Sequence, residues 1–176
     1  MKDIVILLPC LNEEDTVGMC IEEINNTINK SNFNIEIIVV DNGSTDKTIE
    51  IAKSYNVKVL DSTVSSRFGY GANIQYGIIH SKADILIYAD SDFSYPFYEI
   101  EKFIKLLIDK SMKIDVVIAN RFNKDMEKNA MPFLHKYIGT PILTFIGNLF
   151  YDLKVRDIHS GMRGINVNSF KKLNCK

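Results

Sequence analysis

The stretch ILIYADSD, residues 85–92, places an apolar run directly before two carboxylates. A short run of this kind, bounded by polar residues, is typical of a buried strand in a parallel sheet. Alternate residues of an extended backbone point the same way, so Asp90 and Asp92 can face one ligand while Ser91 turns aside. Carboxylates suit Mg²⁺ or Mn²⁺, which often bind through one or two of them plus substrate phosphates. The stretch predicts a strand that ends in a candidate metal site, with a solvated loop start as the alternative.

The composition predicts one globular domain. The chain has 176 residues, 46% hydrophobic and 24% charged, which is enough for a sizeable core. Its formal net charge is −1 with both signs interspersed, so nothing indicates nucleic-acid binding. Cys10, Cys20 and Cys175 lack C-x-x-C spacing, which argues against a disulfide framework or thiolate zinc site and favours a reducing, cytoplasmic location. We expect no signal peptide, and no stretch approaches the ~20 apolar residues that span a bilayer.

Strand-like and helix-like segments alternate along the chain as far as Ala119. The expected strands are Ile4 to Leu8, Ile35 to Val40, Val57 to Leu60, Ile85 to Tyr88 and Asp115 to Ala119. The expected helices are Glu13 to Lys30, Thr45 to Tyr55, Ala72 to His80 and one that aligns Ile100, Phe103, Ile104, Leu107 and Ile108. This alternation predicts an α/β fold, with a mostly parallel twisted sheet, helices on both faces and ligands at the strand carboxyl ends.

Two loops at that edge carry polar groups. PCLNEE, residues 9–14, follows the first strand, and DNGSTD, residues 41–46, follows the second. Within the second loop, Ser44 or Thr45 is expected to N-cap the next helix, with Asp46 in its first turn. Capping therefore accounts for the end of this loop.

Capping does not account for Asp41. Parallel strands end at one edge, so Asp41 is expected beside Glu13 and Asp90. Like charges repel there unless a cation or hydrogen-bond donors intervene. We therefore favour a ligand-binding role for Asp41 over capping.

Specific absences exclude several familiar sites. The first turn contains no glycine, which excludes a dinucleotide-binding G-x-G-x-x-G there, and the chain has no G-K-[ST]. A phosphoacceptor receiver domain would need a pair of acidic residues after the first strand, but Pro9 and Cys10 occupy these positions. His80, His135 and His159 lie far apart, which gives no support to a histidine metal site or a Ser-His-Asp triad.

An ordered set of motifs resembles the family 2 glycosyltransferases with a GT-A fold: LLPCLNEE, VVDNGSTDKT, GYGANIQYGI, YADSDFSYP, NRF and DIHSGMRGI. The set is similar to the branch of dolichyl-phosphate mannose synthase and bacterial polyprenyl-phosphate glycosyltransferases. The resemblance implies transfer of a hexose, with inversion, from a UDP- or GDP-sugar to a polyprenyl phosphate of undecaprenyl or dolichyl type. A saccharide or protein hydroxyl as acceptor, or a non-catalytic nucleotide-sugar-binding subunit, are the alternatives.

The same resemblance implies roles for individual residues. The nucleotide-sugar-binding residues would be Pro9, Leu11, Glu13, Asp41, Asp90 and Ser91. The acceptor-phosphate residues would be Arg121, Arg163 and Ser160, with a structural ion pair as the alternative for each arginine. Asp90, Asp92 and Arg121 would be catalytic, and the two aspartates would hold Mg²⁺ or Mn²⁺. A phosphate acceptor is already ionised near neutral pH, so no strong general base is needed.

The chain departs from the family pattern in places. Asn42 occupies the second acid position after the second strand, and lysines and a histidine stand where a further arginine is expected. Those substitutes are Lys124, Lys128, His135 and Lys136. The sequence ends at Lys176, soon after the last motif, where members of the family that it resembles continue. We therefore expect a single GT-A-like domain over residues 1–176 that is truncated at its C-terminus, with an acceptor side supplied elsewhere as the alternative.

The segment from Phe133 to Tyr151 is apolar, but it is too short and interrupted to span a bilayer. It predicts peripheral contact with the cytoplasmic face of a membrane. A helix packed on the sheet, or a contact in a homo-oligomer, is the alternative. Pro141 is expected to kink this segment or to cap a second helix.

Overall fold

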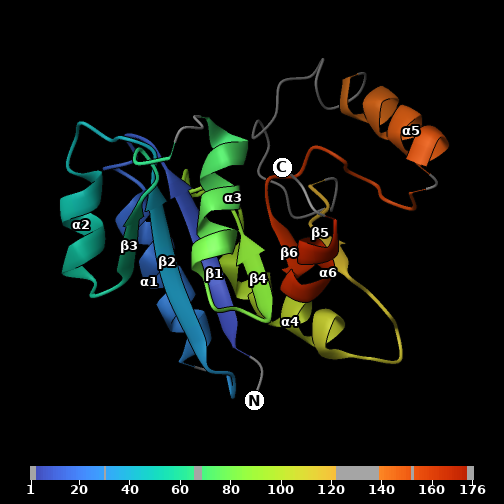
Figure 1. Cartoon of the computed structure of the whole chain (residues 1–176), viewed down its shortest axis with the longest axis horizontal. Coiled ribbons are helices and arrows are strands. Elements are labelled where there is room, and N and C mark those ends of the chain that lie inside the picture. Colours follow the sequence, from blue (N-terminus) through green and yellow to red (C-terminus); the bar gives the residue numbers. More distant parts are fainter. Residues whose placement is uncertain (1–2, 30, 66–68, 122–138, 152, 174–176) are drawn as a thin grey trace. The chain divides into compact units, whose positions relative to one another are not determined.

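The computed structural model describes residues 3–29, 31–65, 69–121, 139–151 and 153–173 (Figure 1). The chain divides into two compact units. One comprises Met1–Val117 with Gly164–Lys176, and the other comprises Ile118–Arg163. The expectation of a single domain stays a prediction.

The described strands form a six-stranded sheet in the order β3-β2-β1-β4-β6-β5. The strands are β1 (Ile4–Cys10), β2 (Ile35–Asp41), β3 (Lys58–Asp61), β4 (Ile85–Tyr88), β5 (Val116–Ile118) and β6 (Arg163–Asn166). Three pairs are parallel: β1 with β2, β1 with β4, and β2 with β3. The strand order reverses at β1, the position where open α/β sheets bind ligands.

Strand β6 runs opposite to its neighbours. The amide of Val167, just after β6, donates to the carbonyl of Asp84, just before β4. The amide of Asn166 likewise donates to the carbonyl of Asp115, just before β5. The end of β6 therefore lies at the start of both neighbours, and the predicted, mostly parallel sheet is confirmed.

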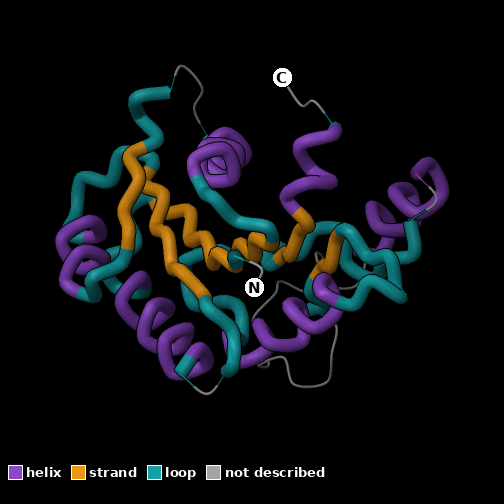
Figure 2. The backbone as a smooth tube through the Cα atoms, turned by 60° about the horizontal axis from the view of Figure 1, so that its bottom comes forward, coloured by secondary structure: helices purple, strands orange, loops and turns teal. Residues whose placement is uncertain are grey.

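Helices cover both faces of the sheet (Figure 2). They are α1 (Val17–Ile28), α2 (Thr48–Ser54), α3 (Tyr70–His80), the 3₁₀ turn η1 (Phe97–Glu99), α4 (Ile100–Ile108) and α6 (Val167–Lys172). On the face covered by α3 and α6, alternate strand residues such as Leu7 and Val40 pack with Ile74 and Ile78 of α3. On the other face, Leu107 of α4 lies near Gly164. Because both faces are covered, β1 is a continuous apolar run, buried along its length.

The second unit contains helix α5 (Thr140–Tyr151). Its buried face is small and polar: Thr144 accepts a hydrogen bond from the amide of Ile158, and Gly147 leaves space for the Ile158 side chain. Pro141 lies in the first turn, where its missing N–H costs no helical hydrogen bond. The preceding residues, 133–138, lie outside the described part of the chain. None of the helices that the structure describes is long and apolar enough to cross a membrane.

Gly77 of α3 provides a test of the packing on β1 and β2. A Cβ at this position would lie 2.5 Å from Leu7 Cδ1 and 2.9 Å from Val40 Cγ2. We expect Gly77→Ala to lower the free energy of unfolding by about 1–3 kcal/mol through overpacking. Urea denaturation measures this change. Gly71→Ala in the same helix meets nothing within 4 Å, and it should leave stability unchanged or raise it. Equal effects of the two substitutions would contradict this account.

Candidate active site

The carboxyl ends of β1, β2 and β4 bring the predicted loops to one edge. Cys10 at the end of β1 lies opposite Asp41 at the end of β2. The loop after β4 returns to β1, where the Ser91 hydroxyl donates to the carbonyl of Pro9 at 2.8 Å. Pro9 is itself buried within β1. The expected convergence of these loops is therefore confirmed.

The acidic segment after β4 is anchored through its middle residue. Ser91 is buried, and its carbonyl accepts a hydrogen bond from the Cys20 thiol of α1 at 3.4 Å. On either side, Asp90 is half-buried and Asp92 is exposed. Strand β4 ends at Tyr88, and the amide of Ala89 makes one further bond to the carbonyl of Leu7 in β1. Beyond Ala89, the two Ser91 contacts connect this segment to β1 and α1. The Ser91 hydroxyl is thus buried against β1, and its nucleotide-sugar-binding role stays a prediction.

Both carboxylates have local hydrogen-bond donors. Asp92 Oδ1 accepts from the amide of Ser94 at 3.0 Å, across a turn in which Phe93 has a φ of 61°. Asp90 Oδ1 accepts from the hydroxyl of Tyr70, the first residue of α3. The Tyr70 contact connects two elements that the sequence did not link.

The donor set fits a hard divalent cation. Two carboxylates, Asp90 and Asp92, flank one buried residue at the edge of the sheet. No cluster of three or more His, Cys, Asp or Glu that could hold a metal is found among the described residues. Mg²⁺ at nucleotide sites usually binds through one or two carboxylates and completes its coordination with phosphate oxygens and water.

The carboxylate of Asp41 is buried in its own turn. Its Oδ2 accepts from the amides of Gly43 at 2.9 Å and Ser44 at 3.1 Å. Gly43 has a φ of 95°, which a residue with a Cβ rarely adopts. The turn-capping role set aside for Asp41 is thus present, and its nucleotide contact stays a prediction.

Asn12 links the loops after β1 and β2. The backbone amide of Asn12 donates to the Ser44 hydroxyl at 2.9 Å, and its side-chain Oδ1 accepts from the backbone amide of Thr45 at 2.8 Å. The prediction that Ser44 or Thr45 caps the next helix is wrong. Both residues precede the helix and form hydrogen bonds with Asn12. Helix α2 begins at Thr48, whose amide donates to Asp46 Oδ1 at 2.9 Å. The sequence analysis did not single out Asn12. Its residue type was the available signal, because asparagine adopts the left-handed backbone conformation more readily than most residues, and Asn12 has a φ of 58°.

Each acid expected at this edge has a hydrogen-bond donor of its own. Glu13 Oε2 accepts from the hydroxyl of Thr16 at 3.0 Å, Asp41 from backbone amides, and Asp90 from Tyr70. Neighbouring Leu11 is 49% exposed, so its side chain is open to a ligand. The edge therefore combines carboxylates in fixed orientations with an accessible apolar side chain.

The thiols below this edge are inert. Burial raises the pKa of both Cys10 and Cys20 to about 12. Both thiols therefore stay protonated at neutral pH.

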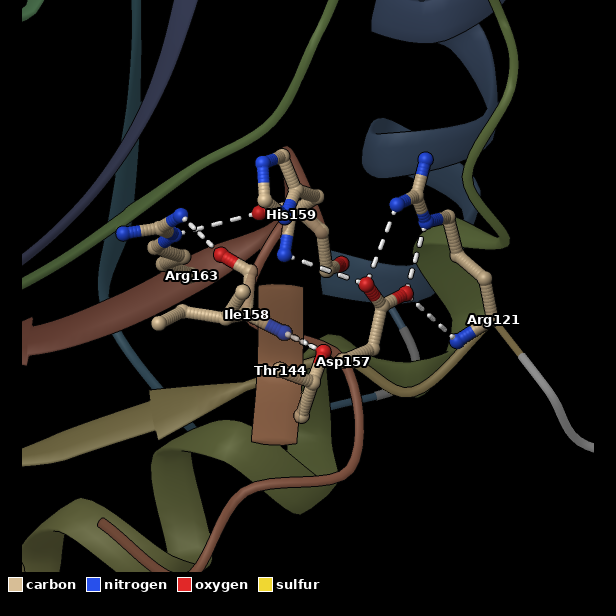
Figure 3. A network of polar contacts seen from close by, with 7 residues as sticks. Arg121, Thr144, Asp157, Ile158, His159 and Arg163 are labelled. Atoms are coloured by element: carbon tan, nitrogen blue, oxygen red, sulfur yellow. Dashed lines mark hydrogen bonds and ion pairs between the residues drawn. The ribbon is translucent and has the colours of Figure 1, made fainter. Parts of the chain in front are cut away.

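Arg121, Ser160 and Arg163 lie in the second unit, which has its own polar network (Figure 3). Arg121 pairs with Asp157 through two bonds, Nε to Oδ2 at 2.7 Å and Nη2 to Oδ1 at 3.0 Å. The Asp157 side chain is 0% exposed, and it also accepts from the amides of Arg121 and His159. Burial would raise the pKa of Asp157, but the hydrogen bond and charge of Arg121 outweigh it and hold the pKa below its usual range.

Asp157 was not identified from the sequence. It is the first residue of the motif DIHSGMRGI, and its position there was the available signal. Only the serine and the arginine of this motif were predicted to be site residues. Because Arg121 is 25% exposed, the buried Asp157 fixes one side of a guanidinium that solutes can reach. The structural ion pair considered for Arg121 therefore exists, and a contact with phosphate stays a prediction.

Arg163 and Ser160 hold their own loop. Arg163 donates from Nη2 to the carbonyl of Ile158 at 2.8 Å and from Nε to that of Ser160 at 3.1 Å (Figure 3). The buried Ser160 hydroxyl has no hydrogen-bond partner among the described residues. Their roles at an acceptor phosphate stay predictions. The substitutes for the expected arginine, Lys124, Lys128, His135 and Lys136, lie outside the described residues.

Comparison with solved structures shows the class of fold. The sheet and its helices match those of glucosyl-3-phosphoglycerate synthase from Mycobacterium tuberculosis with a TM-score of 0.73 and 22% identity. The match covers 95% of this chain and 58% of that one. The architecture is that of the GT-A glycosyltransferases, as predicted.

The chain belongs to glycosyl transferase family 2, whose family model matches residues 5–173. It is 31% identical over 170 residues to the low-salt glycan biosynthesis hexosyltransferase Agl6 of Haloferax volcanii, covering 97% of this chain and 40% of that protein. It is 27% identical to the dolichyl-phosphate hexose transferase of the same organism, covering 92% and 65%. The chain thus spans less than two thirds of either relative. The predicted family is confirmed.

The pair between Arg121 and Asp157 predicts a pH-dependent stability. The folded pKa of Asp157 lies below its unfolded value, so the pair stabilises the fold above pH ~4 and is lost as pH falls through the folded pKa. We expect Asp157→Asn to lower the free energy of unfolding by about 3 kcal/mol at pH 7, because a buried partner is removed. The difference in the free energy of unfolding between the variant and the unchanged protein should become smaller below pH ~4.

Urea denaturation between pH 7 and pH 3 measures both effects. Asp15→Asn, at an exposed carboxylate, serves as the matched control and should change little at any pH. If Asp157→Asn lowered the free energy of unfolding by the same amount from pH 7 to pH 3, the assigned pairing would be contradicted.

Proposed function

We propose that this chain transfers a hexose from a UDP- or GDP-sugar to a polyprenyl phosphate, with inversion at the anomeric carbon. The observation that carries the proposal is the pair Asp90 and Asp92, oriented about the buried Ser91 at the carboxyl edge of a family 2 glycosyltransferase fold. The acceptor class is supported by relatives named for dolichyl phosphate, including the dolichyl-phosphate hexose transferase.

The proposed donor site uses a divalent cation. The synthase from M. tuberculosis has been crystallised with Mn²⁺ and UDP-glucose, and with Mg²⁺ and UDP. We assign Asp90 and Asp92 as the residues that would hold Mg²⁺ or Mn²⁺ against the diphosphate. The cation would neutralise the charge that develops on the leaving nucleoside diphosphate, without any proton transfer.

The remaining edge residues are assigned to the nucleoside. Pro9, Leu11 and Glu13 would line the nucleoside pocket, and Asp41 would contact base or ribose. Each of the two carboxylates already has donors within the protein, which restrict its orientation. These carboxylates are therefore already ordered before the nucleotide binds, so binding costs less conformational entropy.

On the acceptor side, Arg121 is assigned to the phosphate. Asp157 holds its Nε and Nη2, which orients the planar guanidinium, and a guanidinium suits bidentate phosphate contacts. Arg163 and Ser160 are kept as acceptor-phosphate residues by family resemblance. The phosphate oxygen would attack the anomeric carbon as the bond to the diphosphate breaks.

The metal assignment is tested by Asp92→Ala, because this side chain is exposed and its loss should not unfold the protein. We expect the Mn²⁺-dependent part of UDP or GDP binding to weaken at least about tenfold. Isothermal titration calorimetry with and without Mn²⁺ measures this. Asp109→Ala, at an exposed carboxylate after α4, is the control and should bind as the unchanged protein does. Unchanged affinity for Asp92→Ala would count against the assignment.

The acceptor is tested with radiolabelled UDP- and GDP-hexoses and vesicles that contain a polyprenyl phosphate. We expect label to enter the lipid-phosphate fraction in the unchanged protein and to be lost in Asp92→Ala. If nucleotide binds but no label reaches the lipid, the polyprenyl phosphate acceptor is wrong. Label on an added saccharide or protein would then support the hydroxyl-acceptor alternative.

We also propose that α5 rests on the membrane that carries the acceptor, at its cytoplasmic face. The helix has no charged residue, and its apolar side chains are exposed, with Phe145 at 67%, Leu149 at 68% and Phe150 at 74%. The exposed cations Lys154 and Arg156 follow shortly after it. An uncharged apolar surface beside cations matches the interface of an anionic bilayer.

Paired aspartates in α5 test this contact. Ile142 and Ile146 are 52% and 42% exposed, so Ile142→Asp with Ile146→Asp should leave the fold intact. We expect the double variant to lose co-sedimentation with vesicles of phosphatidylglycerol and phosphatidylcholine. Ile79→Asp, at a 63% exposed isoleucine of α3, should pellet as before.

Two results would overturn the membrane contact. Unfolding of the double variant would indicate a packed helix. Unchanged pelleting together with a loss of self-association would indicate a contact between copies of the chain.

A further inference from the structure

The geometry points to Tyr70 as a positioning residue for the proposed metal site, where its hydroxyl holds one carboxylate oxygen of Asp90. The inference deepens the proposed function, because it rests on Asp90 as a metal ligand. Tyr70 donates to Oδ1 of Asp90 from the start of α3, an element separate from the loop after β4 that carries the acidic pair. The second carboxylate oxygen, Oδ2, is the one we assign to the metal.

The backbone around Tyr70 directs it to this position. Gly69 has a φ of 97°, which a residue with a Cβ adopts only with strain, and α3 begins at the next residue. One turn later, the buried Asn73 donates from Nδ2 to the carbonyl of Val40 near the end of β2, at 2.9 Å. The amide of Asn73 also donates to the carbonyl of Gly69 at 3.0 Å. The start of α3 is thereby tied to the same sheet edge as the acidic segment.

The geometry of the contact makes Tyr70 the donor. A carboxylate oxygen has no proton to give, so the Tyr70 hydroxyl supplies the hydrogen of its bond to Asp90 Oδ1. Hard cations are suited to carboxylate, carbonyl and water oxygens. We therefore assign Tyr70 to act through Asp90 and not as a ligand itself.

A held carboxylate suits the metal. Mg²⁺ requires near-octahedral geometry and is bound by few carboxylates, so their orientation matters. Hydrogen bonds to ligating carboxylates fix this orientation, and losing one typically costs about 10–100-fold in metal affinity. If Tyr70 instead competed with the metal for Asp90, removing its hydroxyl would raise the affinity. The two roles give changes of opposite sign.

Tyr70→Phe separates them, because it removes the hydroxyl and keeps the ring. We expect the Kd for Mn²⁺, measured by electron paramagnetic resonance on the UDP or GDP complex, to rise about tenfold. The Kd for the nucleotide without metal should stay the same, whereas a merely structural disturbance would shift both. Tyr98→Phe, at a 62% exposed tyrosine of η1, is the matched control and should change neither value.

The failures are distinguishable. If the unchanged protein binds Mn²⁺ but Tyr70→Phe binds it equally or more tightly, Tyr70 does not position Asp90 and the proposed function stands. A parallel loss of metal-free nucleotide binding would show a structural role and would overturn the inference. If the unchanged protein binds no Mn²⁺, the metal site fails and the inference fails with it.

Discussion

The hydrogen bond from Ser91 to the carbonyl of Pro9 is the contact on which the candidate site depends. The backbone bonds between β4 and β1 continue as far as the amide of Ala89, the residue before the acidic pair. The buried Ser91 ties this segment to the end of β1, and Asp90 and Asp92 take their positions on either side. The parallel register of β1 with β2 then places Asp41 at the same edge. One buried hydroxyl thus connects the packing of the sheet to the chemistry of its loops.

Each of three acids at this edge has its own hydrogen-bond donor. Glu13 is held by Thr16, Asp41 by the amides of its turn, and Asp90 by Tyr70. The second unit follows the same rule, with a buried Asp157 satisfied by Arg121 and by backbone amides. Carboxylates oriented by such contacts pay little reorganisation when a ligand arrives, which is the basis of electrostatic preorganisation.

The sequence predicted the parts of the fold that periodicity encodes. Continuous apolar runs located β1 and β4, and the alternation with helices led to a parallel sheet with its loops at one edge. It did not predict the bond from Tyr70 to Asp90 or the pair of Arg121 with Asp157, because each joins elements distant along the chain through side-chain geometry. The N-cap at Ser44 or Thr45 failed for the same reason, since a distant residue, Asn12, takes their hydrogen bonds.

The central claim is that a cation bound by Asp90 and Asp92 meets a nucleoside diphosphate at the carboxyl edge. Paramagnetic broadening by Mn²⁺ in the ¹⁵N spectrum of the nucleotide complex tests this location most directly. Substoichiometric Mn²⁺ should first broaden the amide signals of residues 89–94, with those of the loops after β1 and β2 next. Signals of residues 89–94 that stay sharp while Mn²⁺ broadens another part of the chain would contradict the account.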